Sequence, residues 1–432
     1  MSNNNKEEKL GLFFRFKTFL TSSKGIFQNN PSRIRTKIDF IDFSNFNPTD
    51  RKTYYLFRTE NNDIKKYLNH ADNAKEKRDN MFSIKFDNGI YILNSLINKS
   101  LILPTENNIN IIKNKIWYIV NNEKKNDDKD ENEDYYIIQG DIIKLGKELY
   151  IFSEIKLNIS EEKKETIIYD INSLNRNRGF IFDICSQPKV LNKKNYCEHI
   201  VNDLEGGKDS PKFKEIKNWI EEYRLKNSQT QKVKKYPFSL KICEKCIKCN
   251  KFYPLRYKLK ENSEVIEFIE LDKPKENYII LESVEELEDI DKQVIKTFYV
   301  IELTGEYETI RIGRNNDNDV ILSSKDISRY HSIIKYSKNN GKLIIKNLSD
   351  SSGTMVLIKT GSLQISDKRN IYLQSGTTFF ETKVIKEEEY KKIEEEYKKE
   401  NDKKNFDVPN NETKTPLEKE MEENSNSKDS NN

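Results

Sequence analysis

Two arginines and a serine in the last third of the chain have the residue types that bind a phosphate group. Arg314 directly follows Gly313, and its planar guanidinium can donate two hydrogen bonds to one phosphate. Glycine lets the chain turn where a side chain would clash. Ser328 lies in the polar segment 323–329, where its hydroxyl can donate to a phosphate oxygen and Arg329 adds a second charge. These residues predict a phosphate site.

A second group of residues has the types that bind a metal. Cys246 and Cys249 form a C-x-x-C pair, and Cys197 and His199 form a C-x-H pair upstream. Thiolates and imidazoles are the usual ligands of structural zinc. The alternative is that these residues are buried, inert thiols, or that Cys243 replaces one member of the pair.

Composition excludes several classes of function. The 75 basic and 71 acidic residues are interspersed and leave a net charge of only +4, so we expect no nucleic-acid partner. No run approaches the roughly 20 apolar residues of a membrane span, so we expect no membrane partner. Five cysteines in 432 residues do not suggest a secreted disulfide scaffold. We therefore expect an intracellular protein, cytoplasmic or nuclear, without an organic cofactor.

The phosphate candidates lie between segments that alternate apolar and polar residues, as half-buried strands do, at 298–303, 331–336 and 342–346. Three blocks in this region, I-R-I-G-R at 310–314, S-R-Y-H at 328–331 and N-L-S-D-S-S-G-T at 347–354, resemble the forkhead-associated (FHA) domain in order and spacing. The resemblance implies a β-sandwich at 292–386 that binds phosphothreonine peptides, and a signalling role.

The FHA resemblance also implies roles for single residues. Arg314 and Ser328 hold the phosphate, Arg329 assists or contacts the peptide, and the Ser351 hydroxyl touches the phosphate. Ser352 stands where many members have an asparagine that bonds the peptide backbone, which leaves the peptide preference open. Three residues have structural roles: Gly313, Gly353 and His331, which braces the loops from inside.

The cysteine region, with Trp219 between its two pairs, resembles the RING-variant zinc finger that precedes an FHA domain in a family of ciliate proteins. The resemblance places one metal site on Phe182, Cys185, Lys212 and Glu215. It places the other on Cys197, His199, Cys246 and Cys249. The first site has lost three of its four ligands, whereas the second is complete, so we expect a degenerate finger with one structural zinc ion.

The enzymatic alternative is a RING-variant ubiquitin ligase that selects phosphorylated substrates through the FHA domain. Ile184 and Trp219 match positions that contact the ubiquitin-conjugating enzyme in active fingers. The lost first site shapes that surface, so we expect an adaptor or scaffold rather than an enzyme, and assign no catalytic residue.

Residues 36–158 also alternate apolar runs with turns, and their end, Q-G-D-I-I-K-L-G-K-E-L-Y-I-F at 139–152, resembles the final strand pair of FHA-like sandwiches. We expect a degenerate FHA-like β-domain, or else an unrelated β-sandwich. The predicted fold is mainly β. Its predicted units are a polar segment 1–35 with a short amphipathic helix at 10–20, the β-domain 36–158, the finger 178–258, a spacer 259–291, the FHA domain 292–386, and a charged helix with a disordered tail at 387–432.

Overall fold

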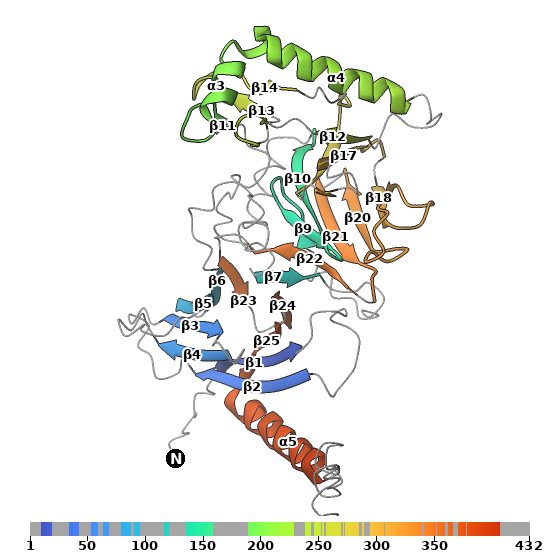
Figure 1. The fold of residues 1–432 in the computed structure, drawn as a ribbon. Helices are drawn as coiled ribbons and strands as arrows, with labels where there is room; N and C mark the ends of the chain where they lie inside the picture. Colours follow the sequence, from blue (N-terminus) through green and yellow to red (C-terminus); the bar gives the residue numbers. More distant parts are fainter. Residues whose placement is uncertain are drawn as a thin grey trace, which may run out of the picture.

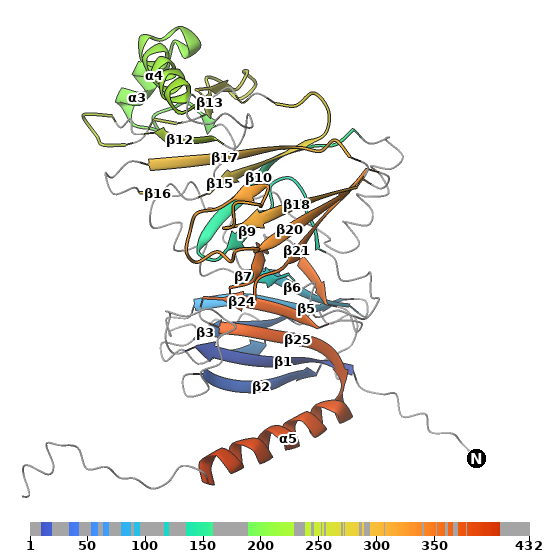
Figure 2. The same cartoon turned by 90° about the vertical axis from the view of Figure 1, so that its right-hand side faces the viewer.

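The computed structural model describes residues 10–19, 34–42, 53–58, 64–68, 79–87, 90–95, 116–120, 135–158, 189–228, 238–242 and, with gaps of one to five residues, 246–406. Strands dominate, as predicted, and form two β-sandwiches stacked end to end (Figure 1). A small helical module lies at one end of the stack and a single helix lies at the other (Figure 2).

The upper sandwich of Figure 1 has a five-stranded sheet in which apolar residues alternate with polar ones. Its strands, in order across the sheet, are β19 (Val320–Ile321), β18 (Tyr307–Gly313), β20 (Ser332–Ser337), β21 (Lys342–Asn347) and β8 (Tyr135–Tyr136). The facing sheet consists of β17 (Val294–Glu302), β15 (Tyr278–Ser283), β10 (Glu148–Lys156), β9 (Ile142–Leu145) and β22 (Thr354–Leu357). Ile334 and Ile345 of the first sheet pack in one core with Leu281 of the second.

The lower sandwich has the same two layers. Its five-stranded sheet is β4 (Ile64–Leu68), β3 (Thr53–Arg58), β5 (Asp79–Asp87), β6 (Ile90–Ser95) and β23 (Ser362–Ile365). The facing strands are β2 (Ile34–Asp42), β1 (Leu10–Phe19), β25 (Thr378–Lys386), β24 (Ile371–Ser375) and β7 (Ile116–Ile119). Phe82 on β5 meets Phe14 on β1 and Phe380 on β25, at ring-centroid distances of 6.4 and 5.3 Å.

Each sandwich takes its last strands from the other half of the chain. In the upper sandwich β8 pairs with β21 and β9 pairs with β22, although β8 and β9 belong to residues 135–145. In the lower sandwich β23 pairs with β6 and β25 pairs with β1, although β23 and β25 belong to residues 362–386. β7 and β22 pair antiparallel between the sandwiches and join the two long layers into one continuous sheet. The predicted division between 36–158 and 292–386 therefore does not separate the sheets.

Two further expectations change for the same reason, which is that partner strands are distant in sequence. The predicted spacer contains β15, which lies fully buried between β10 and β17. The amphipathic helix expected at 10–20 is wrong, because this segment forms strand β1 between β2 and β25. Leu12 and Phe14 face the core while Phe13 packs under the last helix, so both faces are covered and the apolar run is continuous.

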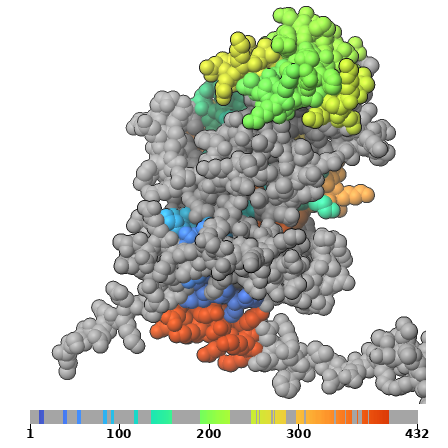
Figure 3. All heavy atoms as spheres, turned by 60° about the vertical axis from the view of Figure 1, so that its left-hand side comes forward, coloured from blue at the N-terminus to red at the C-terminus, as the bar shows by residue number. Residues whose placement is uncertain are grey.

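Both ends of the stack carry an added element (Figure 3). Helix α5 (Glu387–Phe406), within the segment predicted to be a charged helix, packs against β1 and β25. The opposite end holds the finger, which comprises α3 (Glu198–Leu204), η4 (Gly207–Asp209), α4 (Pro211–Ser228) and a sheet of β11 (Lys189–Val190), β13 (Arg256–Lys258) and β14 (Ile266–Glu267). β12 (Phe238–Ile242) and β16 (Leu287–Glu288) extend the long sheet at β17. No helix in the described residues is long and apolar enough to cross a membrane.

Candidate functional site

Three loops of the upper sandwich meet where β18 ends. Gly313 is the last residue of β18, and a Cβ atom there would lie 2.3 Å from the Arg329 carbonyl oxygen, so only glycine fits. The two loops are tied by backbone bonds, from Arg314 N to Ser328 O at 3.0 Å and from Asn315 N to Arg329 O at 3.1 Å. The structure therefore brings Arg314, Ser328 and Arg329 together.

The cations of these loops lack carboxylate partners in the described part of the chain. Arg314 is exposed, and its Nε donates to the Ile327 carbonyl at 3.2 Å. Neither of its Nη atoms, nor the exposed side chains of Lys325 and Arg329, has an ion-pair partner among the described residues. Such a cluster of cations has the charge and the donors to bind a dianion such as phosphate.

Hydroxyl groups from two loops lie beside these cations. Ser328 Oγ is 2.7 Å from Ser349 Oγ, which also accepts from the backbone N–H of Ser352 at 3.3 Å. Ser352 Oγ donates to the Asp326 carbonyl at 3.1 Å. Ser351 lies outside the described residues, so its predicted phosphate contact stays a prediction.

Ser349 was not predicted from the sequence, although a local signal exists. The side chain of Asn347 accepts from Ser349 N and donates to Ser349 O, both at 3.0 Å. This N-x-S turn is the side-chain-to-backbone bonding typical of asparagine in loops. It fixes Ser349 where its hydroxyl meets Ser328.

His331 connects two of these loops from inside the sandwich through hydrogen bonds. Its side chain is fully buried, Nδ1 accepts from Ser328 N at 3.1 Å, and Nε2 lies 3.0 Å from the Gly353 carbonyl. Burial lowers the pKa of His331 to about 4, so the ring is neutral at physiological pH and Nε2–H is the donor to Gly353. Gly353 itself has φ +66°, a left-handed conformation that favours glycine.

The four predicted metal ligands form a second cluster, in the finger. One ligand atom from each of Cys197, His199, Cys246 and Cys249 lies within 4.8 Å of the others. Ligands around tetrahedral zinc lie roughly 3.3–3.8 Å apart, so small side-chain rotations would fit these four to one ion. The Nδ1 atom of His199 is buried without a hydrogen-bond partner among the described residues, as expected of an atom that coordinates a metal.

Local structure positions each pair of ligands. Cys197 is the N-cap of α3, and its Sγ accepts from Ile200 N at 3.4 Å, which places His199 in the first turn. Cys246 and Cys249 occupy a tight turn in which Asn250, at φ +57°, donates its N–H to the Cys246 carbonyl. Burial raises the pKa of the Cys246 thiol, but hydrogen bonds from the backbone N–H groups of Cys249 and Lys248 and with the Cys249 and Cys197 thiols together outweigh it, so the pKa lies below its ordinary value.

The other predicted metal site is not assembled by the described residues. Lys212 and Glu215 lie one turn apart on α4 and form an ion pair with each other at 3.2 Å. Trp219 lies on the same helix and is 39% exposed. Phe182, Ile184, Cys185 and Cys243 lie outside the described residues.

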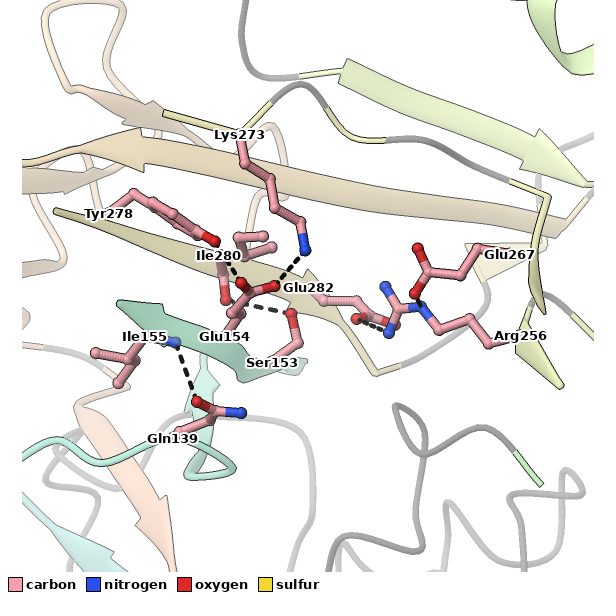
Figure 4. A network of polar contacts seen from close by, with 10 residues as sticks. All are labelled: Gln139, Ser153, Glu154, Ile155, Arg256, Glu267, Lys273, Tyr278, Ile280 and Glu282. Atoms are coloured by element: carbon pink, nitrogen blue, oxygen red, sulfur yellow. Dashed lines mark hydrogen bonds and ion pairs between the residues drawn. The ribbon is translucent and has the colours of Figure 1, made fainter. Parts of the chain in front are cut away.

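The finger is fixed to the upper sandwich by apolar and ionic contacts. Tyr257 and Phe268 of the finger share a core with Tyr278 and Phe298 of β15 and β17. Figure 4 shows the polar contacts at this junction, where Arg256 reaches Glu267 at 3.2 Å and the fully buried Glu282 at 3.3 Å.

A second ion pair lies next to the first in Figure 4, where Lys273 binds Glu154 at 2.6 Å and the Tyr278 hydroxyl also donates to Glu154. Burial would raise the pKa of Glu154, but these two donors outweigh it and hold the pKa below its usual range.

Comparisons with known proteins agree with the loop geometry. The family model of the FHA domain matches residues 310–379, which run from the middle of β18 into β25. No curated protein and no solved structure matches the chain. Residues 310–379 therefore match the FHA domain, a family known for binding phosphopeptides in signalling, and the loops described above lie in the part of this match that belongs to the upper sandwich.

Proposed function

We propose that this protein is a phosphothreonine-peptide-binding adaptor or scaffold that acts through the upper sandwich. The observation that supports this most is a set of three cations, Arg314, Lys325 and Arg329, which have no carboxylate partner among the described residues. Two hydroxyl groups, of Ser328 and Ser349, lie beside them. Like charges on adjoining loops repel one another, and a dianionic phosphate would relieve the repulsion.

Each residue has a distinct task in the proposed complex. The Nη atoms of Arg314 donate two parallel hydrogen bonds to the phosphate, while the bond from Nε to Ile327 holds the guanidinium in place. Ser328 donates its hydroxyl and Arg329 supplies a second positive charge. The neutral ring of His331 holds the Ser328 backbone, so the loop is ordered before the peptide arrives.

An oriented phosphothreonine peptide library tests this function on the full chain. We expect selection of phosphothreonine peptides, with much weaker binding of the same sequences when they are unphosphorylated or carry phosphoserine. Equal binding of phosphorylated and unphosphorylated peptides would contradict the proposal. The selected sequences would also define the peptide preference that Ser352 leaves open.

We further propose that the finger holds one structural zinc ion on Cys197, His199, Cys246 and Cys249. The short separation of the four ligand atoms and the unpartnered Nδ1 of His199 support it. Four protein ligands close the coordination shell, so the ion would stabilise the finger and leave no open position for catalysis. Metal analysis should give about one zinc ion per chain, lost in Cys246→Ser and kept in Cys185→Ser. Two ions, or none in folded protein, would contradict the ligand set.

A ubiquitin ligase is the alternative, and one assay separates it from an adaptor. The Lys212–Glu215 ion pair occupies positions that would ligate the first zinc ion of an active finger. We expect no self-ubiquitination with a broad panel of conjugating enzymes. Ubiquitin chains that form with the natural protein and disappear with Trp219→Ala would favour the ligase.

A further inference from the structure

The turn between β9 and β10 packs against the loop between β19 and β20, which contains Ser328 and Arg329, although the turn precedes that loop by about 180 residues in the chain. Gly146 has φ +62°, and a Cβ atom there would lie 2.6 Å from the Asp326 carbonyl oxygen. The next residue, Lys147, forms an ion pair with the Asp326 carboxylate at 3.0 Å. Residues outside the segment that matches the FHA family therefore form one side of this loop.

Asp326 is closely connected to the proposed phosphate site. Its carbonyl accepts from Ser352 Oγ, and the carbonyl of the next residue, Ile327, accepts from Arg314 Nε. Lys147 therefore lies against the loop that contains Asp326 and Ile327, next to residues proposed to bind the phosphate. Gly146 leaves no room for a side chain against Asp326, so the turn packs closely on this loop.

Two other carboxylates of these loops have partners of their own. Asp317 accepts from the Tyr330 hydroxyl, and Asp319 accepts from the backbone N–H of Arg311 at 2.8 Å. Within the described part of the chain, Asp326 is thus the one carboxylate of residues 314–329 that forms an ion pair.

We propose that Lys147 is a specificity-determining residue that favours phosphothreonine peptides with a second acidic side chain near the phosphate. This inference rests on the proposed function. The side chains of Lys147 and Asp326 are 79% and 45% exposed, and an exposed ion pair contributes little stability. An acidic side chain of the peptide can therefore replace Asp326 as the partner of Lys147, and complementary charge then discriminates between peptides.

Matched peptides measure this preference directly. Each peptide contains one phosphothreonine, and a series replaces alanine with aspartate at single positions on either side. With fluorescence anisotropy on the full chain, we expect the best aspartate peptide to bind about three- to fivefold more tightly than its alanine counterpart, the range of an exposed ion pair. Lys147→Gln should abolish this difference and retain the preference for phosphorylated over unphosphorylated peptide.

Two further variants distinguish specificity from a structural effect. Asp326→Asn removes the competing partner of Lys147, so the aspartate preference should increase. Lys208→Gln is the control, because Lys208 is also an exposed, ion-paired lysine but lies in the finger, 3.8 Å from Glu264. Lys208→Gln should change neither the affinity for phosphopeptides nor the aspartate preference. All variants should unfold at the same temperature as the natural protein.

The outcomes separate this inference from the proposed function. If the natural protein binds phosphopeptides and Lys147→Gln keeps the aspartate preference, or if there is no such preference, the role of Lys147 is overturned and the proposed function survives. If the natural protein binds no phosphopeptide, both are overturned.

Discussion

The two sandwiches have the same strand order but different loops. Across the five-stranded sheets, β19-β18-β20-β21-β8 of the upper sandwich corresponds to β4-β3-β5-β6-β23 of the lower one. Across the long sheet, β17-β15-β10-β9-β22-β7 corresponds to β2-β1-β25-β24-β7-β22. In these two long-sheet series the last strand, β7 or β22, belongs to the other sandwich. The two sandwiches therefore share one strand order, and each contains strands from both halves of the chain, although β18 pairs parallel with β19 whereas β3 pairs antiparallel with β4.

The residues that could bind phosphate differ between these scaffolds. β18 ends in Gly313, followed by Arg314, whereas the corresponding β3 ends in Phe57-Arg58 without a glycine. β20 follows S-R-Y-H, whereas the ten residues before β5, N-H-A-D-N-A-K-E-K-R, contain no S-x-x-H. Under the proposed function, the shared fold supplies a platform and a few loop residues determine which of the two sandwiches binds phosphate.

The largest expected effect concerns the strands that each half of the chain contributes to the other sandwich. A cross-link between such a strand and its partner either forms or does not form. Tyr136 on β8 is in register with Ile344 on β21. We expect a short bifunctional maleimide to join Tyr136→Cys to Ile344→Cys in the monomer, identified by mass spectrometry of tryptic peptides. The control pairs Tyr136→Cys with Ile92→Cys on β6, the corresponding strand of the lower sandwich. A link in the control pair alone would show that each half completes its own sandwich.

The junction between finger and upper sandwich should be the next most sensitive. Arg256→Met would leave the buried Glu282 without its cation, which costs about 3–5 kcal/mol of unfolding free energy. Urea denaturation measures this loss. Because the penalty comes from an unpaired charge, adding Glu282→Leu to Arg256→Met should recover most of it. No recovery in the double variant would contradict the role given to this ion pair.

Acid should destabilise the upper sandwich through His331. The pKa of its ring falls from 6.5 to about 4 on folding, so between these pH values the unfolded chain binds the proton more readily. Stability should therefore decrease as pH falls through this window, by about 3 kcal/mol in total. NMR titration of the ring checks the cause. A ring that titrates near 6.5 in the folded protein would contradict it.

The smallest effect is expected at the far end of the lower sandwich. Tyr390 of α5 stacks on Phe40 at 4.8 Å and contacts Phe13 at 6.4 Å. Tyr390→Ala should reduce the unfolding free energy by about 1–2 kcal/mol, because the ring is only partly buried. Tyr390→Phe keeps the ring and should reduce it less. Neither variant should change phosphopeptide affinity, so a change would show that the two sandwiches are coupled.

The loop chemistry could be predicted because each motif is contiguous. I-R-I-G-R, S-R-Y-H and the turn from Asn347 to Thr354 each contain their own strand end and polar residues. The metal cluster was predictable for the same reason, since each pair of ligands lies within four residues. The mainly β class followed from alternation of apolar and polar residues, which is a local signal.

Strand partners could not be predicted, because they depend on contacts distant in sequence. The hairpins β9-β10 and β24-β25 both consist of short, apolar-rich strands, and nothing local in their sequences indicates which sandwich they join. The proposed role of Lys147 was missed for this reason, and β1 was mistaken for a helix because α5 covers its second face. The resemblance of residues 139–152 to a final FHA strand pair was informative, but the sandwich they complete is the upper one.

Calorimetric titration of a library-selected phosphothreonine peptide, with Arg314→Ala and Arg58→Ala compared in the full chain, tests the central claim most directly. Arg314→Ala should weaken binding by about 1.5–3 kcal/mol, roughly 10- to 150-fold, because a charge-assisted bidentate contact is lost from an exposed loop residue. Arg58→Ala changes the corresponding strand end of the lower sandwich and should leave affinity unchanged. Equal affinities of the natural protein and Arg314→Ala would contradict the assignment of phosphate recognition to the upper sandwich.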